Sequence, residues 1–195
     1  YEAVQLLFHP FMFTNPLLQP GQENVVNAWG VTNTFPKGVP GSFPVRTPDK
    51  IVVKDIEDWK DYVHAPSLKF TQDQWDMVKA QYDAVDGEQA FKAAFVAPGL
   101  FEQTHHLCEI SNALVYYITN PDEMHDLIKY LTEWELELAE GICSNLHPDA
   151  LFHHDDWGGL DSTFMSPAMF DEFLLEPYKD CLLYTSPSPR DYAAS

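Results

Sequence analysis

The chain has 195 residues, which is enough for one domain and marginal for two. Apolar residues make up 45 % of the sequence and charged residues 21 %, close to the averages of globular proteins, so a mainly disordered chain is excluded. The formal net charge of −19 repels phosphate backbones and anionic lipid, and no run of about 18 apolar residues occurs, so we expect neither nucleic acid nor a membrane as a partner.

Prolines and apolar spacing define the predicted elements of the first part of the chain. Between the prolines, the β-branched and aromatic run 25–35 predicts a strand or hairpin. A short helix is predicted from Asp55 onward, and Pro66 ends it. Thr71 and Gln74 have the spacing of a capping box ahead of an apolar stripe, which predicts a second helix.

A strand and two helices are predicted next. Residues 91–97 are a short apolar run, typical of a buried strand. One helix follows, with four apolar side chains spaced for one face: Leu107, Ile110, Leu114 and Ile118. Asn120 and Pro121 are typical of the start of the next helix. We expect its buried stripe to be Met124, Leu127, Ile128, Leu131, Trp134 and Leu138, and its solvated face to carry Glu133, Glu135, Glu137 and Glu140.

The last predicted elements are a strand over residues 149–156 and a helix over residues 166–179, which Ser166 caps. Helices between strands favour a parallel sheet with right-handed crossovers. The predicted class is therefore α/β, either as an open sheet or as the N-terminal portion of a (β/α)8 TIM barrel.

Residues 181–195 differ from the chain before them. Their Ser-Pro-Ser-Pro run can neither continue a helix nor supply a core face. The amino-acid sequence of these residues also resembles translated sequencing-adapter read-through. We expect residues 1–180 to form one partial barrel domain and residues 181–195 to be a non-native tail, so the natural protein continues past Lys179. This continuation favours the barrel, and the alternative for the tail is a flexible Pro/Ser segment.

Polar side chains follow the predicted strand over residues 149–156. Functional groups of parallel α/β folds lie at the C-terminal ends of strands. We expect Asp155 and Asp156 to be catalytic, by orienting a substrate, stabilising a developing cation or binding a metal. We expect His154 and Trp157 beside them to contact the substrate. The alternative is structural: Asp156 caps the following turn, and the histidines pack in the interior.

Phe101 and Glu102 occupy the equivalent place after the strand over residues 91–97, and we expect both to contact the substrate. An acidic residue there is also favoured by the helix dipole. His106 and Cys108 form a His-x-Cys pair, but residues two apart on a helix point about 200° away from each other and cannot hold one zinc ion. We therefore do not expect this pair to bind zinc, and we assign no metal ligand in this chain.

Several segments together resemble the uroporphyrinogen decarboxylase superfamily over residues 15–180. They are Asn27-Ala-Trp-Gly-Val31, Pro40-Gly-Ser-Phe-Pro44, Ile51 to Val63, Pro98-Gly-Leu-Phe-Glu102, Asp155-Asp-Trp-Gly-Gly159, Ser166-Pro-Ala-Met-Phe170 and Pro177-Tyr178. The resemblance implies a (β/α)8 barrel about twice as long as this chain. The superfamily includes true decarboxylases and corrinoid-dependent methyltransferases. On this basis Trp29 is also expected to contact the substrate.

The charge pattern favours the methyltransferase branch. A decarboxylase acting on uroporphyrinogen must hold eight carboxylates, yet Arg46 is the only arginine outside residues 181–195, and Asp155 stands where the family has a serine. The resemblance implies a small-molecule substrate, a corrinoid protein as partner, and methylcobalamin and zinc as cofactors of the full-length parent, with the zinc ligands in its second half. The alternatives are a decarboxylase that removes acetate carboxyls from a tetrapyrrole, and an inactive truncated fragment.

Two further expectations concern compartment and class. Cys108, Cys143 and Cys181 are far apart and form no Cys-x-x-Cys pair, which favours a reduced, cytoplasmic compartment over a disulfide framework. An acidic module that binds a cationic partner is disfavoured, because the carboxylates are scattered rather than gathered in one block.

Overall fold

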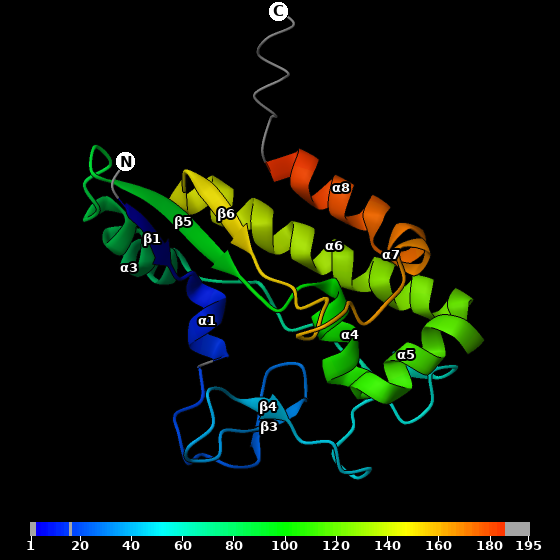
Figure 1. Ribbon diagram of the computed structural model, residues 1–195. Helices are drawn as coiled ribbons and strands as arrows, with labels where there is room; N and C mark the ends of the chain where they lie inside the picture. Colours follow the sequence, from blue (N-terminus) through cyan, green and yellow to red (C-terminus); the bar gives the residue numbers. More distant parts are fainter. Residues whose placement is uncertain (1–2, 16, 186–195) are drawn as a thin grey trace, which may run out of the picture.

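The computed structural model describes residues 3–15 and 17–185, with side chains up to residue 180. It is a mixed α/β structure with a parallel and an antiparallel sheet (Figure 1). The parallel sheet has three strands in the order β1 (Ala3–Leu7), β5 (Ala90–Val96) and β6 (Ala150–His153). Strands β1 and β6 are its edges, so the described part of the chain forms no closed barrel. The predicted α/β class is confirmed at this level.

The small antiparallel sheet consists of β2 (Val25–Val26), β3 (Thr32–Thr34) and β4 (Phe43–Pro44). It confirms the hairpin predicted within residues 25–35. The eight helices of the described residues are α1 (Pro10–Thr14), α2 (Trp59–Tyr62), α3 (Gln72–Asp83), α4 (Leu100–Cys108), α5 (Ile110–Thr119), α6 (Pro121–Leu146), α7 (Pro167–Phe173) and α8 (Leu175–Thr185). No helix in the described ranges is both long and apolar enough to cross a bilayer.

Helices α3 and α6 cover one face of the parallel sheet. The sheet contributes Leu7, Ala94 and Val96 to this core, and the helices contribute Val78, Tyr82, Leu138, Ile142 and Leu146. The opposite face is apolar but open to solvent: Val4 is 64 % exposed, Leu6 46 % and Phe152 45 %. Since parallel sheets are normally covered on both faces, this one-sided cover is an unusual feature of the chain.

A second core joins α4, α5 and the first half of α6 to the N-terminal loops and to α7 and α8. Its side chains include Trp29, Trp59, Phe101, Leu107, Tyr117, Met124, Leu127 and Phe173. Trp134 packs against both cores, and Trp29 meets it edge to face with ring centroids 5.0 Å apart. The two cores therefore continue into one another through α6.

Local signals set several helix boundaries as predicted. Thr71 and Gln74 form a reciprocal capping box at the start of α3, and Ser166 caps α7 by accepting the amide of Met169. Helix α6 begins at Pro121 as predicted, although Asn120 makes no side-chain cap. At Thr71 and Ser166, hydrogen bonds between residues close in the sequence fix the start of the helix.

Four sequence predictions are wrong in detail. The helix predicted after residue 97 breaks at Glu109, whose φ of 70° ends α4, and Ile118 is 73 % exposed rather than buried. The last helix breaks at Leu174 into α7 and α8, and the short helix expected from Asp55 begins only at Trp59. Strand β1 was not predicted. The tail expected over residues 181–195 lies outside the described residues from 186 on.

Candidate functional site

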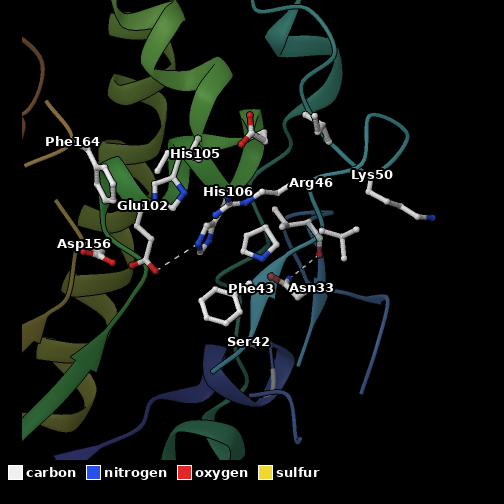
Figure 2. Close-up of a pocket in the computed structure, with 16 residues that line it drawn as sticks. Asn33, Ser42, Phe43, Arg46, Lys50, Glu102, His105, His106, Asp156 and Phe164 are labelled. Atoms are coloured by element: carbon white, nitrogen blue, oxygen red, sulfur yellow. Dashed lines mark hydrogen bonds and ion pairs between the residues drawn. The ribbon is translucent and has the colours of Figure 1, made fainter. Parts of the chain in front are cut away.

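Two adjoining pockets lie at the C-terminal edge of the parallel sheet, between this edge and the small antiparallel sheet. Their volumes are about 290 Å³ and about 260 Å³. They share four lining residues: Asn33, Ser42, Glu102 and His106. Figure 2 shows the larger pocket, with α4 on one side and the segment that carries Ser42, Phe43 and Arg46 on the other. A ligand here would lie where α/β enzymes place their substrates.

The Glu102 side chain lines both pockets. It lies in the first turn of α4, where its Oε2 is 3.3 Å from Nδ1 of His154 and its Oε1 is 3.6 Å from Nε2 of His106. Burial raises the pKa of the Glu102 carboxyl group; His154 opposes this rise, while the charges of Asp155 and Asp156 add to it. A carboxyl group with a raised pKa can take up and release a proton closer to neutral pH.

The two histidines of α4 are neutral at pH 7. Burial lowers the pKa of His106 to about 3, and burial is also the main cause of the lowered pKa of His105. Both side chains line the larger pocket. The contact between His106 and Glu102 is therefore polar rather than an ion pair, and it leaves an imidazole nitrogen available to a ligand.

Two cations line the larger pocket, Arg46 and Lys50, against the carboxylates Glu102, Glu109 and Asp156. Lys50 lies 3.6 Å from Asp49, whereas Arg46 forms no ion pair within the described ranges. Its guanidinium group is free to pair with an anionic part of a ligand. The smaller pocket is more apolar and includes Met12, Leu17, Leu18 and Phe95.

Asp155 lies beside these pockets but binds protein groups. Its Oδ1 accepts the backbone N–H of Glu102 at 2.7 Å, and its Oδ2 accepts that of Phe101 at 3.0 Å. Oδ2 also accepts Nε1–H of Trp157 at 2.7 Å and the hydroxyl of Tyr178. Asp155 lines a separate, mainly apolar cavity of about 800 Å³ with Trp157 and Tyr178.

Asp156 lines the larger pocket. Its Oδ1 also lies 3.4 Å from the backbone nitrogen of Gly158, which is the turn-capping contact named as the structural alternative. Because a hydrogen bond of this length is weak, the Asp156 carboxylate remains accessible to a ligand. The catalytic role of Asp156 stays a prediction.

The structure brings together Glu102, His154 and Asp156 but separates them from three other candidates, Trp29, Phe101 and Trp157. Trp29 is 4 % exposed and Phe101 is fully buried, and neither lines either pocket at the sheet edge. Trp157 is 40 % exposed and packs against Phe170 in the wall of the separate cavity. Trp29 and Phe101 therefore occupy core positions.

Sequence reasoning missed three residues near the site. His106 is four residues after Glu102 on a helix, a spacing that brings two side chains together and could have identified it. Arg46 was noted only as the single arginine of residues 1–180. Glu135, expected on a solvated face, is 4 % exposed and contacts His153. Its place between Leu131 and Leu138 on the buried stripe was the signal that could have revealed it.

His106 and Cys108 do not suit a zinc ion. The thiol of Cys108 is fully buried, and burial raises its pKa to about 12, so the thiolate that zinc requires is disfavoured. No three His, Cys, Asp or Glu side chains in the described part of the chain are placed to hold one metal ion.

Comparison with known proteins gives no relative for this chain: no family model, curated protein or solved structure matches it. The function proposed below is therefore argued from the sequence and from the geometry of the site.

Proposed function

We propose that this chain is the N-terminal part of a (β/α)8 barrel enzyme of the uroporphyrinogen decarboxylase superfamily. The one-sided cover of the parallel sheet supports the barrel. Helices α3 and α6 pack on a single face, while the exposed face carries Val4, Leu6 and Phe152. In a closed barrel the helices form the outer layer and the other face fills the interior. A doubly wound sheet would have helices on both faces.

Within this superfamily we propose the methyltransferase branch. The observation that carries this choice is the charge of the larger pocket, which has two cations against three carboxylates. A substrate with eight carboxylates would meet net repulsion there, whereas a neutral or singly charged molecule would not. The pocket volume of about 290 Å³ also suits a small substrate better than a tetrapyrrole.

The proposed reaction transfers a methyl group from the methylated corrinoid of a partner protein to a small acceptor that carries a thiol. The methylated corrinoid, carried by the partner protein as a co-substrate, would supply the methyl group to the acceptor sulfur and would keep the electron pair of the broken bond to cobalt. The acceptor proton passes to Glu102, whose contacts with His154 and His106 position its carboxyl group. Because His106 and Cys108 do not suit zinc, and no other zinc site is formed by the described residues, no step is assigned to that ion.

The test mixes the protein with methylcobalamin and a small thiol and follows the corrinoid absorbance. We expect loss of the methylcobalamin spectrum together with formation of the thioether, and at least a hundredfold slower reaction in Glu102→Gln. Glu123→Gln is the matched control, since Glu123 is an acidic residue in the first turn of another helix, α6.

Other outcomes favour the alternatives. Conversion of uroporphyrinogen with release of carbon dioxide would favour the decarboxylase. If neither reaction occurs and the chain does not unfold cooperatively as a monodisperse monomer, the inactive truncated fragment is favoured; a monodisperse, cooperatively unfolding monomer would count against it. We also place the protein in the cytoplasm, which agrees with the free thiols of Cys108 and Cys143.

A further inference from the structure

The carboxylate of Asp155 is fully engaged by protein donors. Two of these are the backbone N–H groups of Phe101 and Glu102, in the first turn of α4. The other two are the indole N–H of Trp157 and the hydroxyl of Tyr178 from α8. With four donors on two oxygens, this carboxylate has little acceptor capacity left for a substrate.

Helix α4 needs such a partner. Its own N-cap residue is Gly99, which has no side chain to accept the first free N–H groups of the helix. Asp155 supplies this cap from the segment that follows β6, and its negative charge also interacts favourably with the helix dipole. The approach is close: a Cβ on Gly99 would lie 2.5 Å from Cβ of Asp155 and 2.7 Å from Cε1 of His153.

We propose that Asp155 is a positioning residue: its carboxylate holds the first turn of α4 and thereby fixes the Glu102 carboxyl group between the two pockets. The backbone nitrogen that it binds at 2.7 Å belongs to Glu102 itself. The Glu102 side chain then meets His154 at 3.3 Å, from the same segment that carries Asp155. One residue thus aligns the helix and the end of β6. This inference rests on the proposed function only for its effect on turnover.

A directly catalytic Asp155 is the competing interpretation. Its carboxylate lines the separate apolar cavity and neither of the two pockets at the sheet edge. A substrate in those pockets would therefore reach Glu102 and Asp156 but not Asp155. The two interpretations differ in what a substitution of Asp155 does to the α4 backbone before any substrate is present.

The first experiment measures hydrogen exchange of the Phe101 and Glu102 amides in the full chain by NMR. We expect Asp155→Asn to accelerate exchange of both amides at least tenfold, because each loses a bond to a charged acceptor. Asp156→Asn is the matched control, since its carboxylate touches no amide of α4, and it should change both rates less than threefold. Unchanged exchange in Asp155→Asn would overturn the proposal.

A second measurement needs no substitution. Scalar couplings across hydrogen bonds, from the amide nitrogens of Phe101 and Glu102 to the carboxyl carbon of Asp155, report the contact in the wild-type protein. We expect both couplings to be detected. If Asp155→Asn fails to fold, their presence still supports the proposal, and their absence in well-resolved spectra of the wild type contradicts it.

A third measurement, the pKa of the Glu102 carboxyl group, tests whether Asp155 acts on this group and not only on the stability of the protein. The groups facing Glu102 are His106 on its own helix, His154, Asp155 and Asp156 after β6, and Arg46 across the pocket. Since the Asp155 charge contributes to the raised pKa of Glu102, Asp155→Asn should lower this pKa, measured by carbon NMR. Tyr178→Phe removes one hydrogen-bond donor to Asp155 but keeps the Asp155 charge, so this variant should not lower the pKa of Glu102. A pKa of Glu102 that does not fall in Asp155→Asn argues against the proposal.

Turnover provides the last comparison. If methyl transfer is found, Asp155→Asn should reduce kcat at least tenfold and change KM less than threefold, because the substrate pockets themselves remain. Methyl transfer that is absent from the wild type contradicts the proposed function, while the amide exchange and the couplings still decide the role of Asp155.

Discussion

Nε2 of His153, at the end of strand β6, lies 3.1 Å from Oε2 of Glu135 in the middle of helix α6. The side chains are 17 % and 4 % exposed. Burial lowers the pKa of His153, but the hydrogen bond and the charge of Glu135 outweigh it, so the pKa is raised above 6.5. This contact ties the end of the sheet to its covering helix.

The pair makes the stability of the protein dependent on pH. Because the pKa of His153 is higher in the folded state, its stabilising contribution is fully present below the unfolded-state value of 6.5 and is lost as the pH rises through the folded-state value. Glu135→Gln should therefore lower the pKa of His153 and cost about 3 kcal/mol in the free energy of unfolding at pH 6. Urea unfolding between pH 5 and 9 measures this dependence.

Glu137→Gln is the control for that experiment, since Glu137 is an exposed glutamate on the same helix. Its free energy of unfolding should stay within about 0.5 kcal/mol of the wild type. If Glu135→Gln behaves like this control, the contact between His153 and Glu135 does not form in solution.

Trp29 should behave as a core residue. It is 4 % exposed and packs edge to face against Trp134, so Trp29→Ala is expected to lower the free energy of unfolding by about 3–5 kcal/mol. Trp29→Phe keeps an aromatic ring and should cost less. Denaturant unfolding measures both variants. A stable Trp29→Ala protein that has lost substrate binding would instead support the substrate contact expected from the sequence.

Unlike the substitution of Trp29, a substitution that removes the side-chain amide of Gln103 is not expected to lower the free energy of unfolding. Gln103 is 4 % exposed, and its Nε2 has no hydrogen-bond partner among the described residues. Methionine has a similar length and no donor, so Gln103→Met should leave the free energy of unfolding unchanged or raise it by about 1 kcal/mol. Gln103→Glu places a charge at the same site and should destabilise the protein. A strong loss of stability in Gln103→Met would show that the amide has an essential partner.

Cysteine reactivity tests the burial of the second core. The Cys108 thiol is fully buried, with a pKa raised to about 12, whereas Cys143 is only partly buried. In a Cys181→Ser background at pH 7.5, a thiol reagent should modify Cys143 first. Cys108 should react only at the rate of global unfolding. Rapid modification of Cys108 in the folded protein would mean that α4 opens locally.

Local signals predicted much of the fold. The capping box at Thr71 and the cap at Ser166 set helix starts, and short apolar runs marked strands β5 and β6. Strand β1 carried no such signal, because four of its five residues are exposed and only pairing with β5 makes it a strand. The break at Glu109 was also invisible, since the apolar period continues through it.

The sequence predicted where the candidate site lies, but not which of its side chains bind protein groups rather than a ligand. The positions after the predicted strands indicated Glu102, His154 and Asp156. Glu102 lines both pockets, with Asp156 in the larger one and His154 in the smaller one. The role of Asp155 depends on contacts with residues far away in the sequence, such as Phe101 and Tyr178. Spacing along the chain contains no information about contacts of this kind, so composition and periodicity could not distinguish a ligand-binding carboxylate from a helix cap.

The close packing around Gly99 restricts which residues can replace it during evolution. A methyl group at this position would overlap both Asp155 and His153, which lie on the segment leaving β6. Homologues that keep this packing should therefore be invariant at position 99. Where a larger residue has entered there, the loop after β6 should differ in length or course, so the two segments are expected to diverge together.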